Sequence, residues 1–291
     1  MTSLDGGNAV NVERHLRRVG ALQWQYREAG GHHAGPPLVL LHPSPRNSAM
    51  YEPWMRMLAA HGRVLALDTP GYGGSDALSA PPGSLADYIG PLHQLLQEVA
   101  GPRCVIYGSA TGAQLGIAYA LAQPQAVAHL MLDNAAHFDD DECDRILARY
   151  FPDLTPRADG GHLATAWQMC AQMTEFFPWF ETDEAHRIAA RPAPADVVHS
   201  GVLELLAAGP GYASAYRAAF AHERAAKVQA LTVPTTLLRW QGSILLRHID
   251  RLLGFTLPPQ VAVVDIPAPM AERYAAMTAH LRAVLAQARS C

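Results

Sequence analysis

The sequence predicts an α/β fold in which a mostly parallel, doubly wound sheet carries a helical insertion. Short apolar runs alternate with segments of helical length, and one long helical stretch interrupts this alternation. Continuous Val, Leu and Ile runs are typical of parallel strands that are covered by helices on both faces. A chain of 291 residues is long enough for one such domain and an insertion.

The predicted elements follow the chain in order. Residues 15–19 and 22–28 are expected to form an opening antiparallel pair. Six apolar runs predict the other strands, at residues 37–42, 63–68, 104–108, 129–133, 235–240 and 261–266. Helical patterns lie between and after them, at residues 54–60, 85–99, 114–122 and 271–288.

Residues 138–228 break this alternation. They are rich in Ala and Arg and combine helical patterns with aromatic patches, so we interpret them as a helical cap over the sheet. The predicted core therefore consists of residues 1–137 and 229–291. The predicted cap consists of residues 138–228.

The composition excludes several classes of protein. Hydrophobic residues make up 49% of the chain and charged residues 16%, which excludes a disordered protein. The net charge is −4 and no basic run is longer than Arg17 and Arg18, so we expect neither nucleic acid nor a membrane as a partner. A small molecule is the expected partner, and a homodimer is left open.

The cysteines and histidines indicate no metal and no cofactor. The four cysteines show no C-x-x-C or zinc spacing, and no two histidines have the spacing of metal ligands. The first residues show no basic stretch followed by an apolar run. A cytoplasmic location is therefore the expectation.

Residues 104–113 are the most informative segment, because an apolar strand ends there in small residues and opens directly into a helix. Gly108 and Gly112 flank Ala110, a spacing that lets strand and helix cross closely. With residues 40–45 (LLHPSP) and 66–76 (ALDTPGYGGSD), this segment resembles the α/β-hydrolase superfamily. The resemblance implies a nucleophile elbow at 108–112 and an oxyanion loop at 40–45.

The triad that this resemblance implies is missing. Ala110 stands at the nucleophile position, and Ser109 in a shifted frame would put Tyr107 and Thr111 where small residues are needed. Gln, Gly and Ser at 241–243 replace the expected acid, and Pro, Ala and Pro at 267–269 replace the expected Gly-His pair. Asp133 is an alternative acid in some branches, but it has no histidine and serine to orient.

Three explanations stay open. The favoured one is a non-hydrolytic enzyme that keeps the pocket and replaces the chemistry. The second is a ligand-binding pseudoenzyme. The third is a hydrolase whose serine was mutated to Ala110.

The oxyanion hole survives the loss of the triad, because it is built from backbone N–H groups. Thr111 follows the nucleophile position, and Ser44 is the nearest donor of the oxyanion loop because Pro43 has no N–H. The N-terminus of the following helix adds partial positive charge. Such a site can stabilise an enolate or polarise a carbonyl.

Side chains that could complete the site fall into two groups. The candidate catalytic residues are His137 and His162, which enter from the cap, together with the hydroxyl of Ser109. The candidate substrate-binding residues are His42, Arg46, Ala110, Trp167 and Arg239, of which the two arginines could clamp a carboxylate. His42 also has a structural interpretation.

We therefore expect a cofactor-independent, non-hydrolytic enzyme of the lyase, dehydratase, decarboxylase or cyclase type. Its substrate is expected to be a small, mostly apolar carbonyl or carboxylate compound. Each of these reactions needs positioning, an oxyanion hole and proton transfer by a histidine, but no acyl intermediate.

Overall fold

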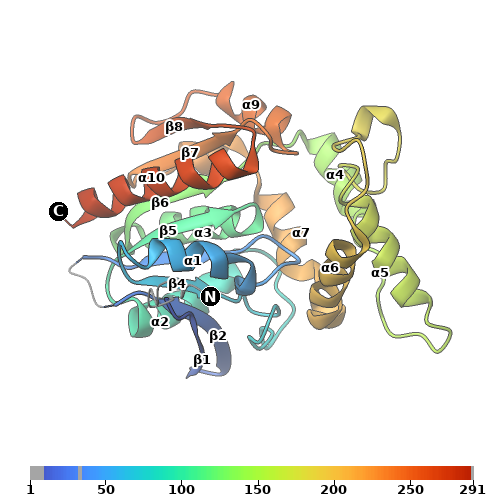
Figure 1. The fold of residues 1–291 in the computed structure, drawn as a ribbon, viewed down its shortest axis with the longest axis horizontal. Helices are drawn as coiled ribbons and strands as arrows, with labels where there is room; N and C mark the ends of the chain where they lie inside the picture. The colour runs from blue at the N-terminus through green and yellow to red at the C-terminus, as the bar shows by residue number, and fades with distance from the viewer. Residues whose placement is uncertain (1–9, 32–34, 290–291) are drawn as a thin grey trace, which may run out of the picture.

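The computed structural model describes residues 10–31 and 35–289, and its sheet has eight strands in the order β1-β2-β4-β3-β5-β6-β7-β8 (Figure 1). The strands are β1 Glu13–Val19, β2 Leu22–Ala29, β3 Leu38–Leu41, β4 Val64–Leu67, β5 Cys104–Ser109, β6 Val127–Asp133, β7 Thr235–Trp240 and β8 Val261–Ile266. β1 and β2 form the predicted antiparallel pair, the other six strands lie where apolar runs predict them, and the predicted fold class is confirmed.

The register of the sheet brings three strand ends together. β2 pairs antiparallel with β1 and β4, and the pairs from β4 through β3, β5, β6 and β7 to β8 are parallel. Gly108 lies opposite Leu41, and Ser109 lies opposite Asp133. The ends of β3, β5 and β6 therefore share one edge, where ligands bind in open α/β sheets.

Helices cover both faces of the sheet. The helices α1 Glu52–Leu58 and α10 Met270–Ala288 pack on one face, and α2 Ala86–Val99 and α3 Thr111–Ala122 pack on the other. A further helix, α9 Leu246–Leu253, was not predicted. Two 3-10 turns, η1 Ser48–Tyr51 and η2 Pro124–Ala126, precede α1 and β6.

The chain between β6 and β7 is helical, as the cap prediction requires. It contains α4 Asp140–Arg149, α5 Gly161–Gln172, η3 Glu184–His186, α6 Ala195–Ala207, η4 Gly209–Gly211, α7 Ala213–His222 and α8 Ala225–Gln229. Figure 1 shows α4, α5 and α6 to one side of the sheet, whereas α7 lies against α3. The exact domain limits at 137/138 and 228/229 stay predictions.

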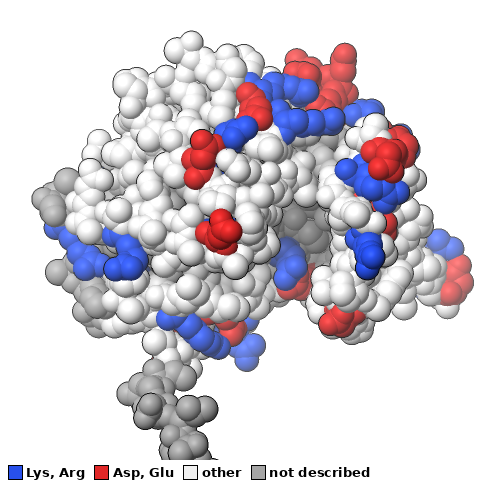
Figure 2. All heavy atoms as spheres, turned by 45° about the horizontal axis from the view of Figure 1, so that its top comes forward, with Lys and Arg blue, Asp and Glu red and all other residues white. Residues whose placement is uncertain are grey.

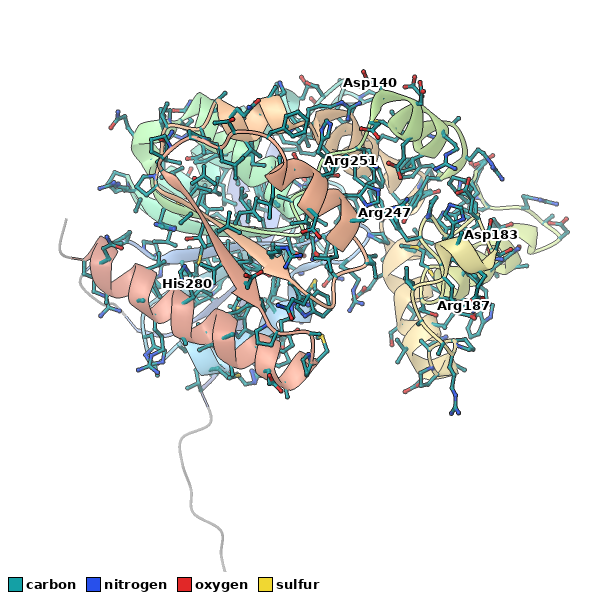
Figure 3. All side chains as sticks on the ribbon, turned by 90° about the horizontal axis from the view of Figure 1, so that it is seen from above. Asp140, Asp183, Arg187, Arg247, Arg251 and His280 are labelled. Atoms are coloured by element: carbon teal, nitrogen blue, oxygen red, sulfur yellow. The ribbon has the colours of Figure 1, made fainter. Side chains whose placement is uncertain are left out.

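Polar contacts fasten the two ends of the cap to the core. The buried Tyr72 hydroxyl donates to the carbonyl of Tyr212, which precedes α7. At the other end, Glu142 of α4 accepts hydrogen bonds from His248 and Arg251 of α9. Burial raises the pKa of Glu142, but these hydrogen bonds outweigh it and lower the pKa to about 2. Figure 3 shows Arg251 on the side of α9 that faces the cap.

The surface carries no large field of one sign on the face shown in Figure 2, where acidic and basic side chains are interspersed. Within residues 10–31 and 35–289, no helix combines the length and the apolar character that a bilayer span requires.

The turn between β5 and α3 is the sharp elbow that the sequence predicts. β5 ends at Ser109 and α3 begins at Thr111, so Ala110 alone makes the turn. Its φ of 48° and ψ of −112° lie outside the ordinary regions for a residue with a side chain. A Cβ on Gly112 would lie 2.1 Å from the carbonyl oxygen of Leu41, and one on Gly108 would lie 2.2 Å from that of Gly112.

Gly112→Ala should therefore destabilise the protein by roughly 2–4 kcal/mol, because the added methyl group meets a backbone oxygen that cannot rotate away. Denaturant unfolding measures this. Gly201→Ala is the matched control, since Gly201 lies within α6 and a Cβ there would meet the Cys170 side chain at an ordinary contact distance of 3.7 Å. That change should stabilise the protein by about 0.5–1 kcal/mol. Equal stability of Gly112→Ala and the native protein would contradict the close crossing.

Candidate active site

A cavity of about 300 Å³ lies above Ala110, between the core and the cap. Aromatic side chains form much of its wall: Trp54 and Tyr107 from the core, and Tyr150, Phe176, Phe177 and Phe220 from the cap. A dry cavity of roughly 150 Å³ holds one benzene ring. This cavity therefore has room for a ring with a short functional chain.

The two predicted donors of the oxyanion hole meet at one side of the cavity. Ser44 and Thr111 both line it, and the Ser44 amide donates to the Thr111 hydroxyl over 3.3 Å. This distance is long for an N–H···O hydrogen bond, so a ligand oxygen can replace the hydroxyl as acceptor at little cost. The Thr111 amide lies at the first position of α3, where N–H groups have no partner within the helix.

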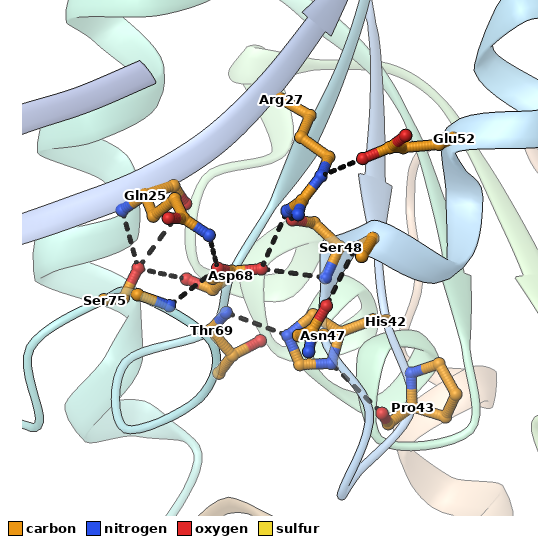
Figure 4. Close-up of polar contacts among 12 residues, drawn as sticks. Gln25, Arg27, His42, Pro43, Asn47, Ser48, Glu52, Asp68, Thr69 and Ser75 are labelled. Atoms are coloured by element: carbon orange, nitrogen blue, oxygen red, sulfur yellow. Dashed lines mark hydrogen bonds and ion pairs between the residues drawn. The ribbon is translucent and has the colours of Figure 1, made fainter. Parts of the chain in front are cut away.

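A buried polar network fixes the loop that carries Ser44 (Figure 4). Asp68 accepts hydrogen bonds from the Ser48 amide at 2.8 Å and from the Gln25 side chain at 2.7 Å. Arg27 lies between Ser48 and Glu52 and binds both. Since these groups lie on or next to the sheet, η1 and α1, the loop holds the Ser44 amide in place.

His42 belongs to this network and not to the cavity. Its Nε2 accepts a hydrogen bond from the Thr69 amide, and its Nδ1 donates to the Pro43 carbonyl, both at 3.0 Å. Burial lowers the pKa of His42, so the ring is neutral at neutral pH. The structural interpretation of His42 agrees with this geometry, whereas a substrate contact does not, because His42 does not line the cavity.

Asp133 lies at the opposite side of Ala110, and several side chains donate hydrogen bonds to its carboxylate. Its Oδ2 accepts hydrogen bonds from the Tyr107 hydroxyl at 2.7 Å, the Ser109 hydroxyl at 3.0 Å and Arg273 at 2.6 Å. Its Oδ1 is buried without a partner. The Ser109 hydroxyl thus lines the cavity as a donor to Asp133, and no histidine among the described residues lines the cavity beside it.

Arg273 reaches the cavity from the first turn of α10. Its guanidinium lies 3.9 Å from the centre of the Trp240 ring, and one of its nitrogens binds Asp133. The residue follows the Pro-Ala-Pro segment in which the family resemblance places a histidine. A permanent cation therefore occupies the region from which a titratable base is expected.

Glu223, just after α7, is a buried carboxyl group in the cavity wall. Its Oε1 accepts hydrogen bonds from the Ala136 amide and the Gln114 side chain, both at 3.2 Å. Burial raises the pKa of Glu223 to about 8, although these two hydrogen bonds lower it. Glu223 is consequently protonated over most of the neutral range.

The hydrogen bonds around Gln114 determine which oxygen of Glu223 holds the proton. His222 is neutral at neutral pH because burial lowers its pKa to about 4, and its Nδ1 lies 2.9 Å from Gln114 Oε1. That oxygen can only accept, so the Gln114 amide nitrogen points at Glu223 and donates. With Oε1 accepting two hydrogen bonds, the acid proton belongs on Oε2, which has no hydrogen bond to the described residues.

Known proteins resemble this chain over part of the sequence and over almost all of the fold. A family model described as alpha/beta hydrolase fold matches residues 36–179. The pimeloyl-[acyl-carrier protein] methyl ester esterase of Nitrosospira multiformis is 38% identical over 99 residues, which are 34% of this chain and 38% of that protein. Epoxide hydrolase 3 of Xenopus tropicalis is 32% identical over 114 residues, 38% of this chain and 30% of that protein.

A carboxylesterase structure from Nitrososphaera gargenis superimposes with a TM-score of 0.72 at 16% identity, covering 94% of this chain and all (100%) of that one. This chain has the α/β-hydrolase fold. The curated relatives match over only 30–38% of their length, so their activities do not carry over to this α/β-hydrolase-fold protein by similarity alone.

The structure does not bring the two predicted histidines to the elbow. His137 accepts a hydrogen bond from the Ala225 amide at 3.3 Å and lies against the Phe255 ring. His162 accepts one from the Arg157 amide at 3.1 Å and lines a separate groove on the cap. Neither residue lines the cavity above Ala110, so the predicted placement of both is wrong. The position of both histidines in the predicted cap suggested that they lie near Ala110, but in the structure both rings lie outside the cavity above it.

Three predicted substrate contacts are also corrected by their positions outside the cavity lining. Arg46 forms an ion pair with Glu204 of the cap. Arg239 binds Asp250 and Asp265, so its charge is already compensated. Trp167 is 43% exposed on α5. Each of the two arginines pairs with a carboxylate outside the cavity, and the Trp167 ring faces solvent. The spacing of residues in the sequence does not reveal such contacts.

Glu223 and Arg273 are the site residues that sequence reasoning missed. Each lies far along the chain from Ala110, in a segment without a motif. A weak signal existed for Arg273, because it closely follows the segment where a histidine is expected. For Glu223 there was no signal, since its unusual pKa arises from burial.

Without a nucleophile and without a histidine in the cavity lining, the protein should not react with fluorophosphonate probes. Ala110→Ser should hydrolyse p-nitrophenyl acetate no faster than the native protein, because a serine without a base stays protonated and weakly nucleophilic. Gel-based labelling and a spectrophotometric esterase assay measure both effects. Rapid ester turnover by Ala110→Ser would instead support a mutated hydrolase.

Glu223 should also impose a pH dependence on stability. Its pKa is raised from 4.5 to about 8, so the folded state keeps a proton that the unfolded chain releases. This contribution is complete below about pH 4.5 and is lost between there and about pH 8, by up to roughly 1.4 kcal/mol per pH unit. Glu223→Gln has no such proton to release. Its free energy of unfolding in urea should therefore rise relative to that of the native protein as pH rises from 5 to 8. A difference that does not change with pH would contradict the raised pKa.

Proposed function

We propose that this α/β-hydrolase-fold protein is a cofactor-independent, non-hydrolytic enzyme. It catalyses a lyase-, dehydratase-, decarboxylase- or cyclase-type step on a small, mostly apolar carbonyl compound. The observation that carries the proposal is the combination of Ala110 at the elbow with a protonated, buried Glu223 in the same cavity. The site thus has an acid and an oxyanion hole but no nucleophile.

The oxyanion hole supplies the electrostatic part of this chemistry. In each of the four reaction types, negative charge develops on a carbonyl oxygen when a bond at the neighbouring carbon breaks or forms. The amides of Ser44 and Thr111 are held where they can stabilise that charge. Fixed donors of this kind stabilise the transition state without having to reorganise.

Glu223 supplies the proton transfer in place of the expected histidine. Its Oε1 is fixed by two donors, and its Oε2 is left to exchange a proton with the ligand. A pKa of about 8 lies close to the working pH, where a group can act both as acid and as base. Burial, which raises this pKa, is also the usual way in which enzymes adapt a carboxyl group to acid catalysis.

The aromatic wall supports an apolar substrate. Phe176, Phe177 and Phe220 line the cavity from the cap side, and a bound ligand that displaces water against them would strengthen the electrostatic interactions there. Exclusion of water also disfavours hydrolysis, in which water must attack. The relatives with hydrolase names differ from this chain in the chemistry proposed, not in the fold.

Proton exchange at carbon provides the direct test. Phenylpyruvate and 4-phenylbutan-2-one, each incubated with the protein in deuterated buffer, should exchange their α-hydrogens faster than in buffer alone, as measured by proton NMR. Glu223→Gln should lower the enzyme-dependent rate by roughly 10²–10⁴, the usual contribution of a positioned acid or base. The rate with the native protein should rise as pH passes through about 8, because only the carboxylate form of Glu223 can accept the α-proton.

Glu204→Gln is the matched control, because burial also raises the pKa of Glu204 but this residue pairs with Arg46 outside the cavity lining. It should retain the native rate. Binding of both ketones without any exchange would favour the pseudoenzyme. Equal rates for Glu223→Gln and the native protein would show that Glu223 is not the acid.

A further inference from the structure

Arg273 is a cation whose hydrogen-bonding capacity is mostly unused. A guanidinium has five N–H donors, and only one of those of Arg273 meets an oxygen atom of the described residues, at Asp133. One other nitrogen lies 4.0 Å from the Met270 sulfur, and Nε is buried without a partner. Buried donors that remain unpaired cost free energy, so an acceptor from outside the chain would be stabilised here.

The orientation of this guanidinium is fixed before any ligand binds. Trp240 stacks under its plane at 3.9 Å, and Asp133 holds one nitrogen at 2.6 Å. Asp133 itself is held by the hydroxyls of Tyr107 and Ser109. A planar fork that is immobilised in this way loses little entropy when it binds a second planar group.

The ionised groups that line the cavity balance each other, so they do not repel an anion. Among the described lining residues, Arg273 is the one cation, and the two carboxyl groups are Asp133 and Glu223. Glu223 is neutral at neutral pH because its pKa is about 8. Asp133 directs its Oδ2 at two hydroxyl groups as well as at Arg273, so it does not use up the donors of the guanidinium.

We propose that Arg273 binds a carboxylate of the ligand, so that the substrate class is a small aromatic or branched aliphatic carboxylate. Carboxylate and guanidinium match in a planar, bidentate geometry. The apolar part of the ligand would contact Phe176, Phe177 and Phe220. This inference rests on the proposed function only in placing substrate in the same cavity.

The geometry orients such a ligand relative to Ala110. The Ala110 amide donates to the Asp133 carbonyl at 2.9 Å, so Arg273 and Asp133 lie on the β6 side of the elbow. The Ser44 and Thr111 amides lie on the β3 side. A ligand held by its carboxylate at Arg273 can therefore place a second oxygen in the hole only if the two groups are separated by a short chain.

A binding experiment tests this without requiring turnover. The probes are 3-phenylpropanoate and its neutral isostere 3-phenylpropanamide, and isothermal titration calorimetry measures both affinities at neutral pH. We expect the carboxylate to bind roughly 10- to 100-fold more tightly than the amide, the usual value of a charge-assisted hydrogen-bonded pair. Equal affinities, or no binding of the carboxylate at millimolar concentration, would overturn the inference.

Variants of Arg273 test whether this residue causes the preference for the carboxylate over the amide. Arg273→Met should remove the preference for the carboxylate while leaving the affinity for the amide within a few-fold. Arg273→Lys should keep part of the preference, because the charge remains but the planar fork is lost. Arg282→Met is the matched control, since Arg282 is exposed on the same helix and lines no part of this cavity. A preference that survives in Arg273→Met would overturn the assignment, and Arg273→Lys gives the answer if the Met variant does not fold.

The two proposals fail in different ways. If the carboxylate preference is present but α-hydrogen exchange is absent, the inference about Arg273 stands and the proposed reaction is wrong. If exchange depends on Glu223 but binding does not distinguish carboxylate from amide, the proposed function stands and the inference is wrong.

Discussion

The close crossing of β5 and α3 is the constraint on which the rest of the site depends. Gly108 and Gly112 bring strand and helix so near that a single residue, Ala110, turns the chain. This geometry places the Thr111 amide beside the loop of Ser44 and directs Gln114, one helical turn later, at Glu223. The elbow thus positions both the amides of the proposed oxyanion hole and the proposed acid, even though it presents no nucleophile of its own.

Asp133 shows how the site remains stable without a triad. A buried carboxylate without partners is costly, and in a triad a histidine would satisfy it. Here Tyr107, Ser109 and Arg273 converge on one of its oxygens. A substitution of Arg273 is therefore costly in this network, because it would leave the buried negative charge of Asp133 without its ion-pair partner.

The sequence predicts what is local and repeated in this molecule. Six of the eight strands follow from apolar runs and the first two from the expected antiparallel pair, and the elbow follows from small residues at a contact between two backbones. The amphipathic α9 was missed. The side chains of the site could not be predicted, because the contacts of His137 and His162 join them to the Ala225 and Arg157 amides, away from Ala110. The acidity of Glu223 comes from desolvation, which depends on the assembled fold.

The hydrogen bond from Tyr72 to the Tyr212 carbonyl, together with the contact of α7 with α3, attaches the last part of the cap directly to the core. Glu223 follows the part that is tied to the core, whereas Phe176 and Phe177 belong to the segment between α5 and α6. Substitutions in that segment can reshape the wall without displacing the acid. The architecture therefore lets the shape of the apolar wall vary while the group proposed to transfer the proton stays in place.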